Sequence, residues 1–313
     1  MDLIFSVAFL AVVTAITCAV PGTFLVLRHQ SMLVDAMSHA VLPGIVIGAL
    51  VSGKTHSFMM IVAASLMGLI VVIGAEKLRN TGLVAGDADQ GLIFPGLFAV
   101  GVILLSTVLK SVHICEDTVL TGDLNLMALP AEHLLVGGIS IGPRTAWLLL
   151  VVLAVDVAFV AIFYRILKLA TFDPLLAKTM GFPVRAVEYG LMLLVSVTVV
   201  AAFETAGAIL VVSFMIVPPA TALLFSKSLP RLLALGQVVA VVGALVGFWL
   251  AYRFDLATSS MMAATNGLVF IIAFAFAKVR VARARRRAYM HSKRASSEYV
   301  VTLKSSEVLA KVN

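Results

Sequence analysis

Residues 28–44 read RHQSMLVDAMSHAVLPG, and they place an acidic residue and a histidine four positions apart in an otherwise apolar run. On an α-helix, side chains at positions i and i+4 lie on the same face, so Asp35 and His39 can bind one ion together. If the helix begins near Arg28, His39 lies about 16 Å along its axis. That is roughly the middle of a bilayer whose apolar core is about 30 Å thick. Ionisable residues at this depth usually face a bundle interior or a substrate path.

A structural role for the same pair stays open, in which Asp35 and His39 lie at the cytosolic end of the helix and form a polar contact between helices. Pro43 has no N–H to donate to the carbonyl of His39, four residues earlier. We therefore expect a local helix break that leaves this oxygen available to water, a side chain or a cation. Gly44 and Gly48 follow at a spacing that lets membrane helices approach closely.

The composition sets the class of protein. The chain has 313 residues, of which 61% are apolar and 12% are charged, and its mean hydropathy is +1.10. Soluble domains are about one quarter charged. Several uncharged windows of about 20 residues predict an all-α, polytopic integral membrane protein. Cys18 and Cys115 are its two cysteines, so neither a disulfide framework nor a thiolate metal cluster is expected.

The apolar windows predict about nine membrane-spanning helices, with eight to ten allowed because 187–226 is nearly continuous and 131–142 is only weakly apolar. The first window is interpreted as a retained helix, since no basic region precedes it. The expected spans are 3–27, 33–52, 58–75, 92–110, 146–164, 186–203, 206–226, 232–252 and 259–277.

The distribution of lysine and arginine predicts the orientation. The loops on one side, 28–32, 76–91, 165–185 and 227–231, contain nine of these residues, and the loops on the other side contain four. Ten more follow from Lys278 onward. Basic residues are enriched in cytosolic loops, so we expect the amino terminus outside and the tail inside.

The cluster of basic residues after Lys278 indicates a second region that follows the membrane domain. We divide the chain into a membrane domain, residues 1–278, and a basic cytosolic tail, residues 279–313, which we expect to be mobile from Ser292 on. The tail is expected to contact anionic lipid. We do not expect it to bind nucleic acid, because no aromatic interleaving or folded module accompanies the charges.

The loop 165–185 predicts a short cytosolic helix between two membrane spans. Asp173 can cap its first turn and Pro174 can occupy its first position, while Gly181 can end it. A helix of about seven residues follows from this pattern. By itself it could be an ordinary amphipathic connector.

Further polar residues lie inside or beside apolar stretches. Glu204 is either a turn residue at the outer surface or an additional metal ligand or outer gate. Pro218 and Pro219 predict a second helix break, which would line a cavity. Asp156 is costly if it faces lipid. It is an additional metal ligand, a partner of His39 or of another polar group across helices, or a structural hydrogen-bonding group. Asn266 is interpreted as a contact between helices.

Three of these stretches resemble the permeases of the zinc/manganese/iron class of ABC importers. The first is the Asp-x-x-x-His-Ala-x-x-Pro-Gly pattern of residues 35–44. The second is Phe-Asp-Pro…Gly-Phe-Pro at 172–183, with Ala177 four residues before Gly181. The third is the small-residue segment at 203–212, followed by Pro-x-Ala-Thr-Ala at 218–222. Together the resemblance covers roughly residues 5–278.

The resemblance implies a role for each stretch. Asp35 and His39 are expected in the metal path between two permease subunits, and residues 173–181 are expected to dock on an ATPase. It also implies a second permease copy, identical or a paralogue, a cytosolic ATP-binding subunit and an extracytoplasmic metal-binding protein. The location would be the cytoplasmic membrane of a prokaryote. The acidic loop between His113 and His133 contains a turn similar to one in the family, and a role in handing over metal is an open alternative for it.

Missing motifs argue against catalysis by this chain. No Gly-x-x-x-x-Gly-Lys-Ser/Thr, His-Glu-x-x-His or Gly-x-Ser-x-Gly pattern occurs. We therefore expect a non-catalytic subunit without a permanently bound cofactor, which transports manganese, iron or zinc. Carboxylate and imidazole ligands without thiolate suit these metals better than copper(I). The alternative is a secondary transporter or channel for divalent cations that works without an ATPase.

Overall fold

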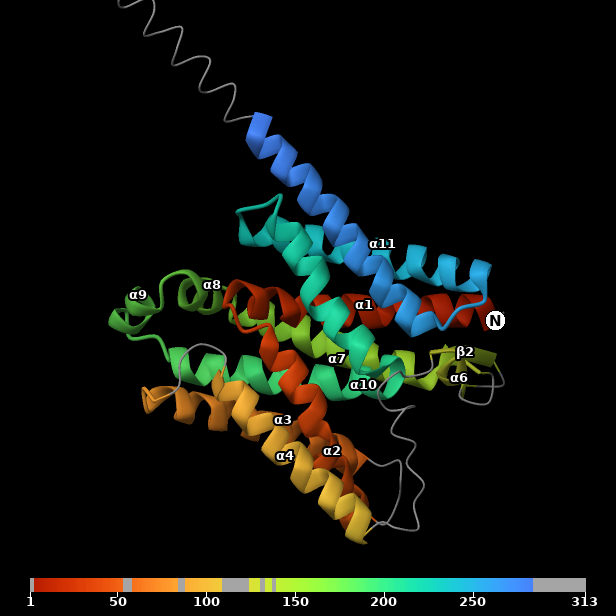
Figure 1. Ribbon diagram of the computed structural model, residues 1–313, viewed down its shortest axis with the longest axis horizontal. Helices are drawn as coiled ribbons and strands as arrows, with labels where there is room; N and C mark the ends of the chain where they lie inside the picture. The colour runs from red at the N-terminus through yellow and green to blue at the C-terminus, as the bar shows by residue number, and fades with distance from the viewer. Residues whose placement is uncertain are drawn as a thin grey trace, which may run out of the picture. The chain divides into compact units, whose positions relative to one another are not determined.

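The computed structural model describes residues 3–52, 58–83, 88–108, 124–129, 133–136 and 139–283, and most of them are helical. Figure 1 shows the arrangement of the labelled elements. The helices are α1 (Leu3–Leu27), α2 (Met32–Ser52), α3 (Phe58–Asn80), α4 (Ala88–Val108), α6 (Leu124–Met127), α7 (Arg144–Ile162), α8 (Tyr164–Phe172), α9 (Pro174–Thr179), α10 (Val184–Leu223), α11 (Leu229–Phe254) and a last helix, Thr258–Arg283.

The predicted helical membrane class is confirmed, whereas the number of nine spans is not. Seven of the described helices are long and apolar enough to cross a membrane, and the apolar part of α4, Gly91–Thr107, is shorter than these. The predicted spans 186–203 and 206–226 lie together in the 40-residue α10. α8 was not predicted as a helix.

Two short strands modify the all-helical expectation. Strand β1 (His133–Val136) pairs antiparallel with β2 (Ile139–Pro143), with Val136 opposite Ile139. The strands lie mostly within residues 131–142, the weakly apolar stretch that made the predicted number of membrane spans uncertain. Most of the acidic loop between His113 and His133 lies outside the described residues, as does the tail from residue 284 on.

α10 contains the sharpest backbone departure in a described helix. Gly207 has φ 77° and ψ 165°, a combination that is essentially restricted to glycine. On a straight helix Leu191 and Met215 would lie about 36 Å apart. Yet Leu191 belongs to the same buried cluster as Val20 and Phe24 of α1, and Met215 lies against Gly22 of that stretch. The second half of α10 therefore turns back toward the same end of α1 at which the first half begins, and Figure 1 shows it returning at an angle to the first half.

The predicted breaks at the prolines are wrong. α2 continues through Pro43 to Ser52, and α10 continues through Pro218 and Pro219 to Leu223. A proline removes one helical hydrogen bond, but its fixed φ near −65° is itself helical, and packing by neighbouring helices can hold the turn. The chain instead bends at Gly207, where the backbone adopts φ and ψ angles that residues with a Cβ atom avoid.

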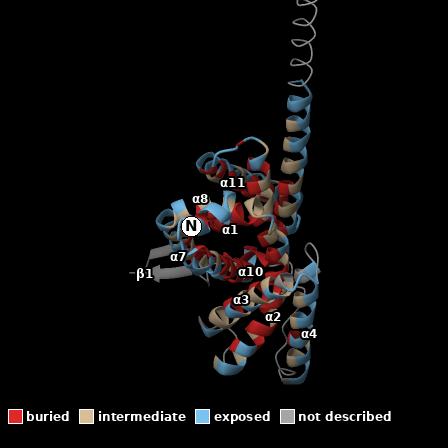
Figure 2. Ribbon diagram, turned by 90° about the vertical axis from the view of Figure 1, so that its left-hand side faces the viewer, coloured by how far each residue is buried: buried red, intermediate tan, exposed pale blue. Residues whose placement is uncertain are grey.

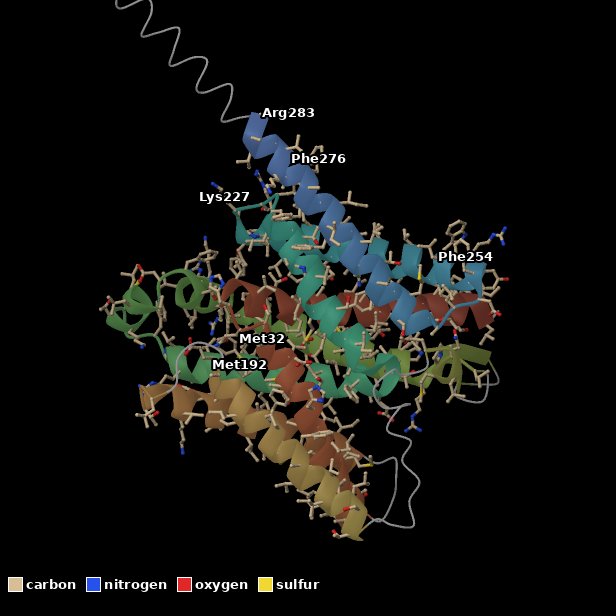
Figure 3. The ribbon with its side chains drawn as sticks, viewed as in Figure 1. Met32, Met192, Lys227, Phe254, Phe276 and Arg283 are labelled. Carbon is tan, nitrogen blue, oxygen red and sulfur yellow. The ribbon has the colours of Figure 1, made fainter. Side chains whose placement is uncertain are left out.

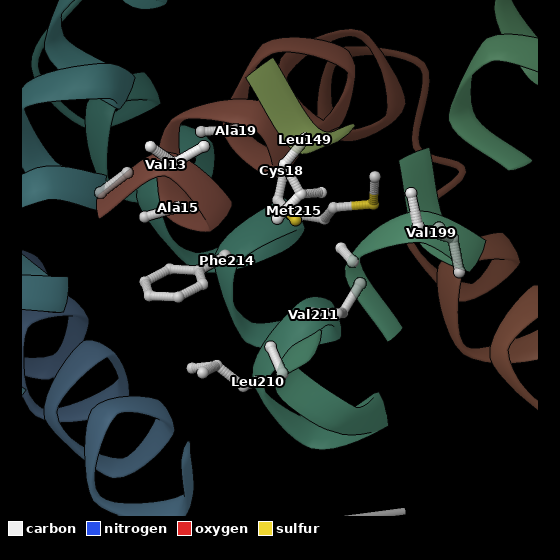
Figure 4. Packing of buried hydrophobic residues seen from close by; sticks show 14 of the residues in the cluster. Val13, Ala15, Cys18, Ala19, Leu149, Val199, Leu210, Val211, Phe214 and Met215 are labelled. Carbon is white, nitrogen blue, oxygen red and sulfur yellow. The ribbon is translucent and has the colours of Figure 1, made fainter. Parts of the chain in front are cut away.

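α1 is the central helix of the core. It contacts α7, α10 and α11, and most of its residues from Leu10 onward are buried (Figure 2). Figure 4 shows Cys18 of α1 beside Leu149 of α7 and Met215 of α10, within the largest buried cluster. In Figure 3, Lys227 and Phe254 mark the two ends of α11, which covers another side of α1.

α2 packs closely against both α3 and α4. A Cβ atom added to Gly44 would lie 2.5 Å from the Cα of Ala64, and one added to Gly48 would lie 2.6 Å from the Cα of Met60. The predicted close approach is therefore confirmed, with α3 as the partner. On the α4 side, a Cβ on Gly101 would lie 2.7 Å from the Cδ of Pro43.

By its contacts the chain divides into two units, Met1–Phe270 and Ile271–Asn313. The first unit holds α1 to α11 and the start of the last helix. There the Asn266 side-chain nitrogen donates a hydrogen bond to Ser213 Oγ of α10 at 3.2 Å, so the predicted helix contact is present. Of the second unit, the structure describes only the helical part that ends at Arg283.

Candidate functional site

α2 presents Asp35 and His39 on one face, as the spacing predicted. The Nε2 atom of His39 lies 3.8 Å from Oδ1 of Asp35. The side chains are 33% and 45% exposed, respectively, although both stand on an apolar helix. Ser38 is buried and donates a hydrogen bond from Oγ to the carbonyl of Asp35 at 2.7 Å. The pair is therefore available on the surface of this single chain.

Two aromatic rings of α4 hold the His39 imidazole. Phe94 stacks on it with a centroid distance of 5.4 Å and an interplanar angle of 19°, and Phe98 meets it edge-on at 5.8 Å and 80°. Phe94 also packs against the buried Ala36 and Ala40 of α2. The ring thus has one face covered by α4, and its orientation is restricted by packing.

The pair offers two protein ligands. In the described part of the chain, no group of three or more histidine, cysteine, aspartate or glutamate side chains could hold a metal ion. One imidazole nitrogen and one carboxylate suit manganese, iron(II) or zinc, all of which take four or more ligands. A bound ion would need further ligands from water or another chain.

Asp156 lies in a different part of the bundle from the Asp35–His39 pair. It is fully buried on α7, and Thr198 of α10 donates a hydrogen bond to its Oδ2 at 3.0 Å. Val200, two positions further along α10, packs instead with Val41 of α2. Positions two apart on a helix point to nearly opposite sides. The first half of α10 therefore stands between Asp156 and α2.

Glu204 is exposed, three residues before the bend at Gly207. This position agrees with the turn interpretation that the sequence left open. The structure does not group it with Asp35 and His39 in a metal-holding cluster.

The predicted short helix is confirmed as α9. The Asp173 carboxylate caps it by accepting a hydrogen bond from the Leu176 N–H at 2.9 Å, and Pro174 is its first residue. Gly181 follows with φ 77° in the left-handed region. Ala177 is the buried residue of this helix and packs with Ala170 and Val184.

The outer side of the α9 region is apolar. Leu175 is 73% exposed, and several neighbours are also exposed although they are large and hydrophobic: Phe172, Leu176, Met180 and Phe182. Basic Lys178 stands in the last turn. An exposed apolar patch with a polar rim is typical of a protein–protein contact. The distribution of lysine and arginine predicts that this surface faces the cytosol.

Sequence reasoning missed the position of Arg28, the residue directly after α1. Its side chain is only 8% exposed, and Nη1 donates a hydrogen bond to Glu188 Oε1 of α10 at 3.2 Å. Its Nε donates to Thr171 Oγ1 of α8 at 3.3 Å. Burial lowers the pKa of the guanidinium, and the Glu188 carboxylate acts in the opposite direction. A lone arginine between two apolar helices was the only signal in the sequence.

Comparison with known proteins gives one consistent result. The chain is 38% identical to the manganese transport system membrane protein MntD of Bacillus subtilis over 265 residues, which is 85% of this chain and 89% of that protein. It is 39% identical to the zinc transport system membrane protein TroD of Treponema pallidum over 270 residues, 86% of this chain and 73% of that protein.

A solved structure has the same fold. The chain matches PsaBC from Streptococcus pneumoniae, solved in complex with Fab, with a TM-score of 0.72 and 27% identity, covering 88% of this chain and 91% of the other. The model of the ABC 3 transport family matches residues 1–277. This chain therefore belongs to the ABC 3 transport family.

Proposed function

We propose that this protein is the multi-pass membrane permease of a prokaryotic ABC importer for a divalent transition-metal ion, manganese, iron(II) or zinc. The observation that carries the metal assignment is the Asp35–His39 pair, which offers a carboxylate and an imidazole 3.8 Å apart on an apolar membrane helix. The manganese and zinc transport relatives support the same class of substrate. The ion is cargo, and the chain holds no resident cofactor in this proposal.

In this proposal Asp35 and His39 bind the ion while it crosses the membrane. The carboxylate attracts the cation, and the imidazole binds through a neutral nitrogen. Glu204 and Asp156 remain the next candidates if the path lies elsewhere, and the hard oxygen donor Glu204 slightly favours manganese or iron.

A second permease copy, identical or paralogous, would complete the coordination. Its own Asp–His pair would bring the number of protein ligands to four, which is within the range of these metals. Twofold symmetric assembly places such pairs face to face, because the same surface of each copy forms the contact. The exposed side of the Asp35–His39 pair fits this arrangement.

ATP hydrolysis would be supplied by a separate cytosolic subunit that docks on α9. The capped helix formed by Asp173, Pro174 and Ala177 and ended by Gly181 presents the exposed apolar patch described above. An extracytoplasmic metal-binding protein would deliver the ion to the opposite side. We assign residues 1–278 to the membrane permease and the basic residues 279–313 to a cytosolic tail that contacts anionic lipid.

The experiment compares metal uptake by cells that carry wild type, Asp35→Asn or His39→Gln. Both substitutions keep a polar side chain of similar size, so insertion is expected to be retained. We expect either change to reduce uptake of Mn²⁺, Fe²⁺ or Zn²⁺ at least about tenfold, the loss that corresponds to one charge-assisted contact. Uptake is normalised to the amount of permease in the membrane, and the profile over the three metals identifies the cargo.

Asp156→Asn compares the two candidate locations of the metal path, because it also neutralises a carboxylate on an apolar helix but on the far side of α10 from α2. If the path runs along α2, it should leave uptake per permease molecule near the wild-type value, and a loss in Asp156→Asn alone would move the path to Asp156. Normal uptake by both Asp35→Asn and His39→Gln would remove the pair from the metal path. Loss of membrane insertion with normal uptake per inserted molecule would instead support the structural role.

A further inference from the structure

The contacts of Arg28 connect three parts of the chain that are far apart in sequence. Thr171 lies on α8, just before α9, and Glu188 lies on α10, just after it. Arg28 donates hydrogen bonds to both, at 3.3 and 3.2 Å. One guanidinium group thus contacts residues on both sides of α9 in the sequence, Thr171 before it and Glu188 after it.

We propose that Arg28 is a positioning residue for transport, which transmits movement of the α8–α9 segment to α2 and its Asp35–His39 pair. This inference rests on the proposed docking of an ATPase on α9 and on the proposed metal role of α2. It adds the residue through which the two sites act on each other.

The connection from Arg28 to α2 is short and hydrogen-bonded. The turn begins with the Arg28 N–H bonded to Phe24 O, and the Gln30 N–H bonds back to Leu25 O at 2.9 Å. The Leu33 N–H of α2 then bonds to Gln30 O at 3.1 Å, and His29 has φ 56° in the left-handed region. These hydrogen bonds leave the turn few alternative conformations, so a displacement of Arg28 would move the start of α2 as well.

A second contact leads from the same place to α3. Tyr189, next to Glu188, lies close to Glu76 of α3. α3 in turn meets the backbone of α2 at Gly44 and Gly48 without intervening side chains. Both routes end on α2, one at its first turn and one along its length.

The chemistry of the guanidinium explains why these elements would move together. The group is almost fully buried, and in the described part of the chain its Nη2 has no hydrogen-bond acceptor. Separation of Arg28 from Glu188 would leave a buried charge unpaired, which costs more than the pair itself contributes. The planar fork can donate to Thr171 and Glu188 at once, whereas the compact ammonium group of a lysine cannot reproduce this geometry.

The test uses the complete complex of permease, ATPase and metal-binding protein in proteoliposomes, with Mn²⁺ as the probe. The measured quantity is the number of metal ions accumulated per ATP hydrolysed, which a purely structural contact would not change. For Arg28→Gln and Glu188→Gln we expect this ratio to fall about fivefold or more, with ATP hydrolysis retained, as lost charge-assisted hydrogen bonds imply. Arg28→Lys should be intermediate.

Two further variants keep the test decisive. Thr171→Val preserves shape and charge and removes one contact, so a lowered ratio supports the proposal even where Arg28→Gln does not assemble. Arg231→Gln removes an exposed arginine in the first turn of α11, on the same predicted side, and it should keep the wild-type ratio.

The outcomes separate the two proposals. A wild-type complex without ATP-driven metal uptake would reject the proposed function and this inference with it. Wild-type ratios in assembled Glu188→Gln and Thr171→Val, in a complex that does transport metal, would overturn the role of Arg28 alone. A ratio lowered equally by Arg231→Gln would also overturn it, since the effect would then follow from basic charge in general.

Discussion

The imidazole of His39 stacks on the ring of Phe94, with the centroids 5.4 Å apart and the planes inclined by 19°. This contact joins α2 to α4 and fixes the ring of a proposed metal ligand. Phe94→Leu keeps an apolar side chain there and removes the stacking. An aromatic pair is worth about 0.5–1.5 kcal/mol, so we expect the KM for metal uptake to rise about two- to tenfold.

The maximal uptake rate should change little in Phe94→Leu, because both ligands remain. Phe248→Leu is the matched control, since Phe248 also stacks on a neighbour, Tyr252 of α11, in another part of the bundle. Uptake kinetics over a range of Mn²⁺ concentrations provide the measurement. An unchanged KM in Phe94→Leu would show that the stacking does not orient His39 for metal.

Gly181→Val should weaken the stimulation of the ATPase by the metal-binding protein. Gly181 has φ 77° and no atom within 4 Å of an added Cβ, so valine meets backbone strain without a clash. The end of α9 would shift, and the docking surface with it. We expect at least about a threefold loss of ATP hydrolysis stimulated by the metal-binding protein, with normal membrane insertion, from a strain of about 1–2 kcal/mol.

Gly82→Val is the control for Gly181→Val. Gly82 has φ 70° and equally open surroundings, but it lies in the turn after α3. The two substitutions impose the same kind of strain at different places on the predicted cytosolic side. Equal losses in both variants would assign the effect to general destabilisation and contradict the docking role.

Gly207→Ala should destabilise the protein by about 1–3 kcal/mol, because φ 77° with ψ 165° is a conformation that alanine rarely adopts. Thermal unfolding of the purified permease in detergent measures the loss as a lower midpoint. Gly267→Ala in the last helix is the comparison, since an added Cβ there meets nothing within 4 Å and no left-handed backbone is involved. A midpoint for Gly207→Ala at or above that of Gly267→Ala contradicts the bend.

The orientation can be tested with single cysteines at positions 2 and 300, after Cys18 and Cys115 are replaced. An impermeant thiol reagent applied to intact cells should label position 2 and leave position 300 unlabelled, because basic residues concentrate on the cytosolic side. Lysed cells provide the control, in which both positions should react. Labelling of 300 but not of 2 in intact cells would reverse the assignment.

The sequence by itself determined the features that depend on neighbours along the chain. Uncharged windows located most of the long apolar helices, although not their number, and the spacing of Asp35 and His39 placed them on one face. Asp173, Pro174 and Gly181 specified where α9 begins and ends. These features follow from the helical repeat and from local backbone preferences, which act over four residues or fewer along the chain.

Only the tertiary structure decided which distant residues meet. It placed Phe94 on His39, and it brought Glu188 and Thr171 to Arg28 across more than a hundred intervening positions. It also put the bend at Gly207 and left α10 helical at Pro218, because packing can compensate for one lost hydrogen bond, whereas a reversal requires backbone angles available to glycine. Side-chain partners of this kind depend on how helices pack in space, and the helical repeat of a single segment carries no information about the segment it will face.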